Sequence, residues 1–285
     1  MSVRVARSRE LVAQGRSPAL VARVAGISRQ AIYRRPGRPP TGQRRPLDAT
    51  DRIVLNVARS NPTDGTRMVA ALAARRACGP VNRKRVQRLM REHALLQPKR
   101  SEGRRRRPGY FQVTRPDELW HLDMTSVWVA EHGWCYLNAA IDCCTREIVA
   151  WALDIRCRAA EATAVIDVAV AARRIGPGET TLGTDNGTAF TSRAFRARLA
   201  EHQVGHRRGG YRDPESQAFI ESWFAKLKQR CVWREEFETL DEARAVIGAY
   251  IERYHHRPHQ GLAYRTPREV AATWQDHRDQ SIPAA

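Results

Sequence analysis

Apolar residues recur at helical spacing in the first third of the chain and at strand spacing after residue 110. Apolar side chains three or four positions apart share one face of a helix. They predict three helices between residues 48 and 98, marked by Ile53, Val54 and Val57, by Met68, Val69 and Leu72, and by Val86, Leu89 and Met90. Asn82 precedes the third group and is expected to cap its helix.

The segment SPALVARVAGISRQAIYRR, residues 17–35, predicts a helix-turn-helix. Ser17 is an N-cap with Pro18 at the first helical position, Gly26 turns the chain, and Ser28 caps a second helix. The expected small core is Leu20, Val24, Ile27 and Ile32. The residues predicted to contact DNA from the recognition helix are Arg29, Gln30, Arg34 and Arg35. Any two short helices around a glycine share this pattern, so a helical pair that binds no DNA is the alternative.

Beyond residue 110 apolar and polar residues alternate. In DELWHLDMTSVWV, Trp120 and Leu122 fall on one face of a strand while His121 and Asp123 fall on the other. WCYLNAAIDCCT and REIVAWALDI follow at hairpin spacing as two further strands. AAEATAVIDVAVAARRI then reads as a helix, TTLGTDNG as a strand ending in a turn, and SRAFRARLAEHQ as a capped helix. This order predicts an α/β fold in which helices pack over a mixed sheet.

Proline-rich and basic stretches divide the chain into six expected parts. They are a helix-turn-helix domain at 1–36, a linker at 37–47, a basic helical domain at 48–98, a basic connector at 99–112, an α/β core at 113–235, and a C-terminal helix and tail at 236–285.

The positive charge of the chain is confined to its first part. The 285 residues carry a net charge of +19, and residues 1–108 hold 27 Lys and Arg against 6 Asp and Glu. Residues 109–285 hold 22 against 24. A polyanion is expected to bind the first part, and nucleic acid is the favoured one. Basic residues that point away from the apolar stripe of residues 82–96 are predicted to touch phosphates, namely Lys84, Arg85 and Arg88.

The sequence predicts a cytoplasmic protein that does not enter a membrane. No apolar run reaches the roughly 20 residues of a membrane span. The six cysteines show no C-x-x-C pair and no zinc-ligand spacing, so they are expected to be reduced thiols.

Three carboxylates stand out by their positions. Asp185 opens an Asp-Asn-Gly turn at the end of a predicted strand, which by itself is common turn chemistry. Asp123 lies in the middle of the first strand. Glu221 borders a helical apolar stripe that includes Ile220, Trp223 and Leu227, where an acid is costly to place without a function. A solvated acid on the exposed side of the helix is the equal alternative. Lys228 follows Glu221 by two helical turns.

These motifs resemble a known family. WHLDMT, TDNGTAFTS and YRDPESQAFIESWFAKLK, with 35 residues between Asp185 and Glu221, are similar to the Asp-Asp-Glu pattern of transposases encoded by the longer reading frame of bacterial insertion sequences. The tail YIERYHHRPHQGLAYRTPREV matches the Y…R.H..L…TP ending of the same family. The resemblance covers about residues 45–270 and implies a ribonuclease H-like mixed five-stranded sheet, as in retroviral integrase cores.

The resemblance implies a DNA transposase that cleaves the ends of its element and joins them to target DNA. Asp123, Asp185 and Glu221 are then catalytic and bind Mg²⁺ or Mn²⁺, with two ions expected from the chemistry of phosphoryl transfer. DNA contacts are expected from Lys228, Asn186 and Gln217. The expected partners are double-stranded DNA, further copies of the chain assembled on DNA, and a partner-frame protein.

Two other functions share the same residues. One is a ribonuclease H-like nuclease that cuts without joining, and the other is a DNA-binding regulator whose acids are relics. Asp142 is expected either to support the acids or to be a turn residue at a strand end. His255, His256 and His259 are interpreted as surface or DNA-facing residues because Pro258 interrupts any helical metal spacing.

Overall fold

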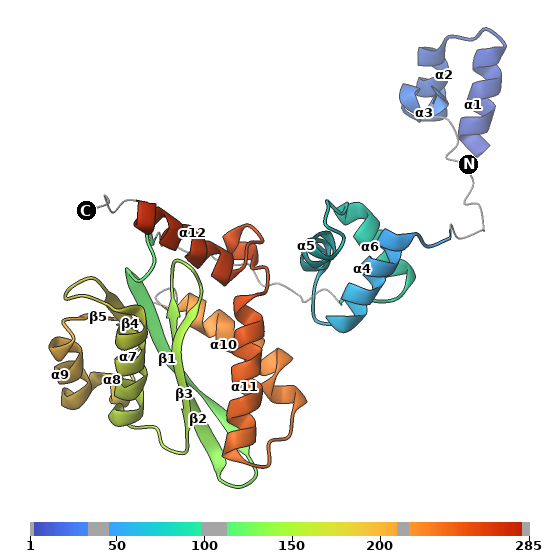
Figure 1. Ribbon diagram of the computed structural model, residues 1–285. Helices are drawn as coiled ribbons and strands as arrows, with labels where there is room; N and C mark the ends of the chain where they lie inside the picture. The colour runs from blue at the N-terminus through green and yellow to red at the C-terminus, as the bar shows by residue number, and fades with distance from the viewer. Residues whose placement is uncertain (1–2, 34–45, 98–112, 210–216, 281–285) are drawn as a thin grey trace. The chain divides into compact units, whose positions relative to one another are not determined.

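The computed structural model describes residues 3–33, 46–97, 113–209 and 217–280, without the side chains of 275–280. It divides into two compact units, residues 1–48 and 49–285 (Figure 1). Each unit is described separately. No helix in the described ranges is both long enough and apolar enough to cross a bilayer. All six cysteines are free thiols.

The first unit is a group of three helices, α1 (Val3–Ala13), α2 (Pro18–Ala25) and α3 (Arg29–Tyr33). Gly26 ends α2 with φ +63°, which makes the turn that its residue type predicted. The Ser28 hydroxyl accepts a hydrogen bond from the Ala31 amide at 3.2 Å, so Ser28 caps α3 as expected.

The predicted core of this unit was partly wrong. Leu20 and Val24 are 55% and 81% exposed, whereas Val21, Ala22 and Ile32 are buried. The reason is α1, which the sequence pattern did not reveal. Its residues Leu11 and Val12 pack against the buried cluster of Val21, Ala22 and Ile32, while Leu20 and Val24 line an open pocket beside Leu11.

The second unit begins with three helices, α4 (Ala49–Ser60), α5 (Thr66–Arg76) and α6 (Arg83–Glu92). Their predicted apolar stripes form one cluster around Val54, Val69 and Leu89. The Asn82 side chain accepts a hydrogen bond from the Lys84 amide at 2.8 Å and caps α6, as predicted.

The rest of the second unit is built on a five-stranded mixed sheet with the strand order β3-β2-β1-β4-β5. The strands are β1 (Leu119–Val129), β2 (Gly133–Asp142), β3 (Ile148–Asp154), β4 (Thr181–Thr184) and β5 (Gly205–Arg208). The first three form an antiparallel meander, and β4 and β5 then add in parallel beside β1. This confirms the predicted α/β fold with a ribonuclease H-like sheet.

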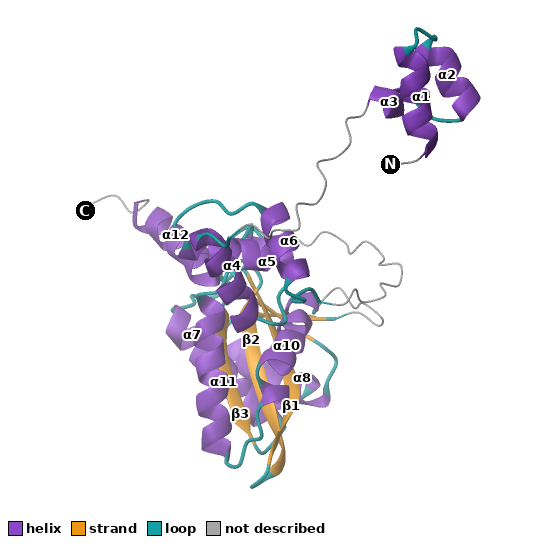
Figure 2. Cartoon of the chain, turned by 90° about the vertical axis from the view of Figure 1, so that its right-hand side faces the viewer, coloured by secondary structure: helices purple, strands orange, loops and turns teal. Residues whose placement is uncertain are grey.

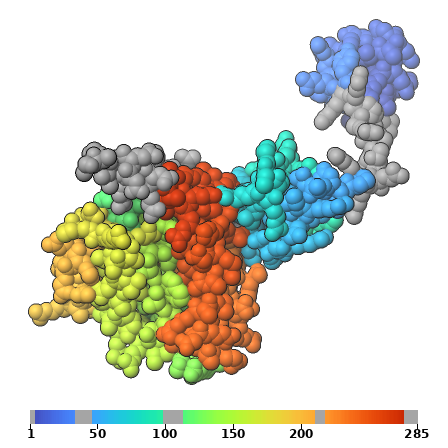
Figure 3. Space-filling model, viewed as in Figure 1, coloured from blue at the N-terminus to red at the C-terminus, as the bar shows by residue number. Residues whose placement is uncertain are grey.

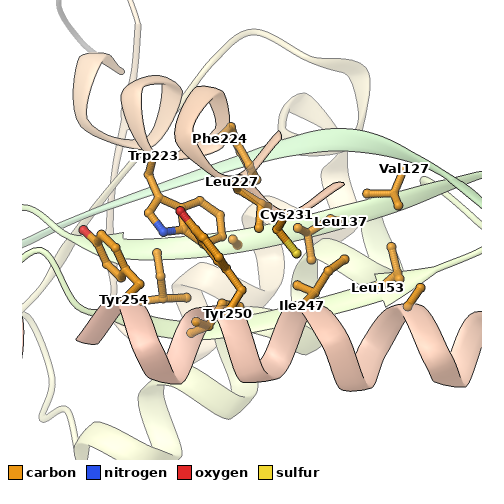
Figure 4. Close-up of a cluster of buried hydrophobic side chains, with 14 of the residues drawn as sticks. Val127, Leu137, Leu153, Trp223, Phe224, Leu227, Cys231, Ile247, Tyr250 and Tyr254 are labelled. Atoms are coloured by element: carbon orange, nitrogen blue, oxygen red, sulfur yellow. The ribbon is translucent and has the colours of Figure 1, made fainter. Parts of the chain in front are cut away.

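Helices cover both faces of the sheet (Figures 1 and 2). On one face α7 (Ala159–Arg173), α8 (Thr188–Thr191) and α9 (Arg193–Glu201) pack over Trp120, Leu122 and Leu182. On the other face α10 (Ala218–Arg230) and α11 (Leu240–His255) pack over Val127, Leu137 and Leu153, as the side chains in Figure 4 show. Successive side chains of β1 point to opposite faces of the sheet, so Trp120 packs in the cluster under α7 and Val127 packs in the cluster under α10 and α11.

Short 3₁₀ turns at Val232–Arg234 and Gln260–Leu262 flank α11, and α12 (Pro267–Gln280) ends the described chain. In the space-filling view the orange-to-red C-terminal helices form an outer layer beside the green and yellow strands and helices of the core (Figure 3).

Two sequence interpretations are settled by this packing. Asp142 is fully buried and accepts hydrogen bonds from the Cys144 amide at 3.0 Å and the Thr145 hydroxyl at 2.6 Å, so it is a turn residue. The interpretation of His255 as a surface residue was wrong, because it is buried and its Nε2 accepts a hydrogen bond from the Ile148 amide at 3.0 Å. His256 is exposed, and His259 is half-buried where it starts the 3₁₀ turn before α12.

Candidate active site

Asp123 lies at the middle of the central strand. On β1 it pairs with Ala139 of β2, so neighbouring strands hold its backbone from that side. Its side chain is half-buried, and one carboxylate oxygen accepts a hydrogen bond from the Met124 amide at 2.7 Å. A carboxylate on a paired central strand has few accessible positions, so it can serve as a rigid ligand.

Asp185 follows β4, the parallel neighbour of β1. His121 pairs with Gly183, so Asp123 and Asp185 each lie two residues beyond the same pair of neighbouring strand residues. The Asp185 side chain is exposed and accepts a hydrogen bond from the Gly187 amide at 2.8 Å. This local turn aims the carboxylate and leaves its second oxygen without a partner from the turn.

Glu221 lies in the first turn of α10. The helix is anchored by four buried side chains, Ile220, Trp223, Phe224 and Leu227, as the apolar stripe predicted. Glu221 is exposed next to this stripe. Lys228 lies two turns further along α10, where it lines a cavity of about 460 Å³ together with Ser126 and Trp128 of β1.

The charges of Asp185, Glu221 and Lys228 all act on the carboxylate of Asp123. The pKa of Asp123 is raised to about 6, first by burial and further by the negative charges of Asp185 and Glu221, while Lys228 and the Met124 amide lower it. Three elements distant in sequence therefore bring like charges near one another. Such an arrangement is costly unless a cation neutralises it.

The donor set suits a hard divalent cation, because Mg²⁺ and Mn²⁺ prefer carboxylate oxygens, and such clustered negative charge attracts them. As the side chains stand, however, no three His, Cys, Asp or Glu groups in the described ranges are arranged as a metal site. The two exposed acids, Asp185 and Glu221, would have to turn toward Asp123 to share an ion.

Two of the residues predicted to contact DNA lie close to this site. The Asn186 amide donates a hydrogen bond to the Gly209 carbonyl at 3.0 Å, which ties the Asp185 turn to the end of β5. Gln217 is buried before α10, and among the described residues neither its amide nitrogen nor its amide oxygen has a hydrogen-bond partner.

The other predicted DNA contacts lie on the helices before the core. Arg29 and Gln30 are exposed on α3, and Lys84 is exposed on α6. Arg85 pairs with Asp51 at 2.7 Å, and Arg88 pairs with Glu92 at 3.2 Å. Both of these guanidinium groups already have a carboxylate partner. Arg34 and Arg35 lie outside the described residues.

Two glycines contribute to the site in ways that their sequence context did not reveal. A Cβ on Gly187 would lie 2.9 Å from an oxygen of the Asp185 carboxylate. A Cβ on Gly183 would lie 2.8 Å from the His121 ring, which is buried beside β4. Asn-Gly in a turn predicts positive φ, but Gly187 has φ −57°. It is therefore space, and not backbone conformation, that requires glycine here.

Three segments match known protein families. Residues 113–214 and residues 202–267 match two families that are each described as an integrase core domain. Residues 48–107 match an HTH-like domain. The two integrase matches together span the sheet, α10 and α11.

Two bacterial relatives match most of the chain. The 39.2 kDa protein of insertion element IS476 from Xanthomonas euvesicatoria is 29% identical over 256 residues, covering 88% of this chain and 71% of the relative. Transposase InsD of insertion element IS2-9 from Escherichia coli K12 is 29% identical over 286 residues, covering 93% and 92%. A simian T-cell lymphotropic virus intasome structure has a TM-score of 0.49 and 16% identity, covering 75% of this chain and 73% of that chain.

The fold and the matched domains define an integrase-core enzyme of the polynucleotidyl transferase class. In this chain an HTH-like domain precedes the integrase core, and its relatives include an insertion-element transposase, so the matches support a transposase of the insertion-sequence type. The sequence-based recognition is confirmed. Integrase core domains depend on a divalent metal ion.

Proposed function

We propose that Asp123, Asp185 and Glu221 are the catalytic acids with which this transposase cleaves element ends and joins them to target DNA. The observation that carries the proposal is the raised pKa of Asp123, because burial and two neighbouring acids act on it at once. A DNA phosphate would add more negative charge to the same place. The site therefore requires cations in order to hold its substrate.

The three acids would hold the metal, for which two Mg²⁺ or Mn²⁺ ions are proposed. A bound ion supplies charge neutralisation at the phosphate and lowers the pKa of the attacking water or 3′-hydroxyl. Asp123 provides the fixed ligand because β1 is paired along its length with β2. Asp185 and Glu221 provide the adjustable ligands, because both are exposed.

Lys228 is proposed to hold a phosphate next to the one that reacts. Two helical turns correspond to roughly 11 Å, so Lys228 is too far along α10 to pair closely with Glu221. Its charge nevertheless acts on Asp123 and it lines the cavity beside β1. A phosphate in that position would set the register of the DNA end over the acids.

The proposed partners are double-stranded DNA, namely the terminal inverted repeats and the target, and further copies of this chain assembled on that DNA. A partner-frame protein that adds DNA-binding segments is part of the same proposal. The protein would act in the bacterial cytoplasm on the nucleoid.

A strand-transfer assay tests the proposal. Duplexes that carry the element's terminal repeats are incubated with the chain and Mg²⁺ or Mn²⁺, and cleaved and joined products are separated on a denaturing gel. We expect joined products from the wild type and none from Asp123→Asn, Asp185→Asn or Glu221→Gln, with duplex binding retained. Cleavage without joining would indicate the nuclease, and binding without chemistry would indicate the regulator.

A further inference from the structure

A small arginine-lined cavity lies where the loop between α4 and α5 meets α10, α11 and the 3₁₀ turn at Val232–Arg234. Its volume is about 270 Å³. Four arginines line it together with side chains that can donate hydrogen bonds from Ser60, Asn61 and Thr63. We call the four arginines the arginine pocket: Arg230, Arg234, Arg253 and Arg257.

A single buried carboxylate offsets part of this charge. Asp64, with 1% of its side chain exposed, accepts a hydrogen bond from Arg230 at 2.8 Å and another from Arg257. Arg257 also donates to the Asn61 side chain at 3.1 Å. These contacts fasten the α4–α5 loop to the core, and they hold the guanidinium groups of Arg230 and Arg257 in place.

Arg234 and Arg253 add charge that no acid offsets. Both side chains are exposed, and neither forms an ion pair with a carboxylate in the described part of the chain. The Arg234 Nε donates a hydrogen bond to the Gln229 carbonyl at 3.1 Å. Four guanidinium groups thus face one carboxylate, which leaves a local excess of positive charge.

The surroundings of Arg257 show the cost of this excess. Burial lowers the pKa of Arg257, and the charge of Arg230 lowers it further, against the favourable effect of Asp64. The Nε atoms of Arg230 and Arg257 are buried, and no acceptor for them lies in the ranges that the structure describes. An anion in the cavity would relieve the repulsion and could accept further hydrogen bonds from the planar guanidinium donors.

The size of the cavity indicates what kind of anion fits. Sites that enclose a whole small molecule span roughly 300–1,000 Å³, and this cavity is smaller. A single anionic group of a longer polyanion, such as one phosphate, fits this cavity better than a whole small molecule does. The cavity is also lined by the α4–α5 loop of the segment that matches an HTH-like domain.

We propose that the arginine pocket binds a backbone phosphate of duplex DNA and so joins the HTH-like helices and the catalytic core on one DNA molecule. Two residues of the tail motif, Tyr254 and Arg257, line this pocket, which gives the Y…R part of that motif a binding role besides packing. The proposal rests on the proposed function only in taking DNA as the substrate.

The test is the salt dependence of DNA binding by the full-length chain. A fluorescent 30-base-pair duplex of arbitrary sequence is titrated with protein at several NaCl concentrations in EDTA, where no phosphoryl transfer takes place. Each phosphate contact contributes roughly 0.9 to the slope of log K against log salt concentration. We expect Arg234→Ala/Arg253→Ala to make the slope shallower by up to about 1, the contribution of one phosphate contact, and Arg234→Lys/Arg253→Lys to restore most of it.

The matched control is Arg193→Ala/Arg196→Ala. It removes two exposed arginines of α9, which lie on the opposite face of the sheet from α10. An unchanged slope in the pocket variant, or an equal change in the control, would overturn the proposal. A third outcome would also overturn it, in favour of a site for a free anion. In that outcome the pocket variant keeps the wild-type slope, and micromolar inorganic phosphate protects the wild-type chain against thermal unfolding.

The two proposals fail in different ways. A wild-type chain that binds the duplex through the arginine pocket but joins no ends would refute the proposed function and leave the pocket assigned. A chain that joins ends normally, with an unchanged slope in the pocket variant, would refute the pocket alone.

Discussion

Asp123→Asn is expected to stabilise the metal-free protein while it removes activity. Asp123 is held in the folded chain with a pKa of about 6 instead of its ordinary 3.8. A difference of about 2 pKa units corresponds to roughly 3 kcal/mol of unfavourable free energy for the ionised carboxylate. The asparagine must still place a polar amide group in the same half-buried position, which offsets about 1 kcal/mol of this. The expected gain at pH 7.5 is therefore about 2 kcal/mol.

The pH dependence identifies the cause. Between pH 3.8 and about 6 the folded chain keeps a proton on Asp123 that the unfolded chain has released. This group's contribution to stability is therefore present at low pH and is lost as the pH rises through that window. Asparagine does not titrate, so the advantage of the variant should be large at pH 7.5 and almost absent at pH 4.

The assay is thermal unfolding in EDTA at pH 4, 5, 6 and 7.5. For a unit of this size, about 2 kcal/mol corresponds to roughly 4–8 °C in Tm. Asp241→Asn, an exposed acid at the start of α11, is the control and should shift Tm by less than about 2 °C. Added Mn²⁺ should raise the Tm of the wild type and not that of Asp123→Asn. Equal Tm values for wild type and variant at pH 7.5, or a difference independent of pH, would refute the reasoning.

Three further predictions concern neighbouring residues. Gly187→Ala should lower the strand-transfer rate by roughly 10²-fold with little loss of stability, because its Cβ would displace the Asp185 carboxylate; a normal rate would contradict this. Gly183→Ala should cost about 1–3 kcal/mol in urea unfolding by pressing on His121, whereas Gly65→Ala, where a Cβ meets nothing within 4 Å, should not. Lys228→Ala should raise the DNA concentration for half-maximal activity and blur the cleavage position, and Lys228→Arg should retain function; equal behaviour of both variants would exclude a role for its charge.

Local chemistry was sufficient to predict most elements of the core. Strict alternation around Trp120 to Val127 predicted β1, and the caps Ser28 and Asn82 predicted two helix starts. The Asp-Asn-Gly turn and the helical stripe beside Glu221 could be placed on their elements, because strand ends, turns and helix faces follow rules that act over a few residues. The interval between Asp185 and Glu221 marked the acids through the resemblance to insertion-sequence transposases. The sequence pattern alone therefore determined the fold class and the position of each acid on its element.

Tertiary packing decided which faces of those elements are buried and which charges meet. The exposed side of α2, with Leu20 and Val24, depends on where α1 lies. The burial of His255 depends on β3, because its partner Ile148 lies 107 residues earlier in the sequence. Asp64 lies in the loop between α4 and α5, and it holds Arg230 and Arg257 from 166 and 193 residues away. Such contacts depend on how the whole intervening chain folds. The repeat of two residues in a strand or 3.6 in a helix shows which side chains share a face, but not which distant element that face will meet.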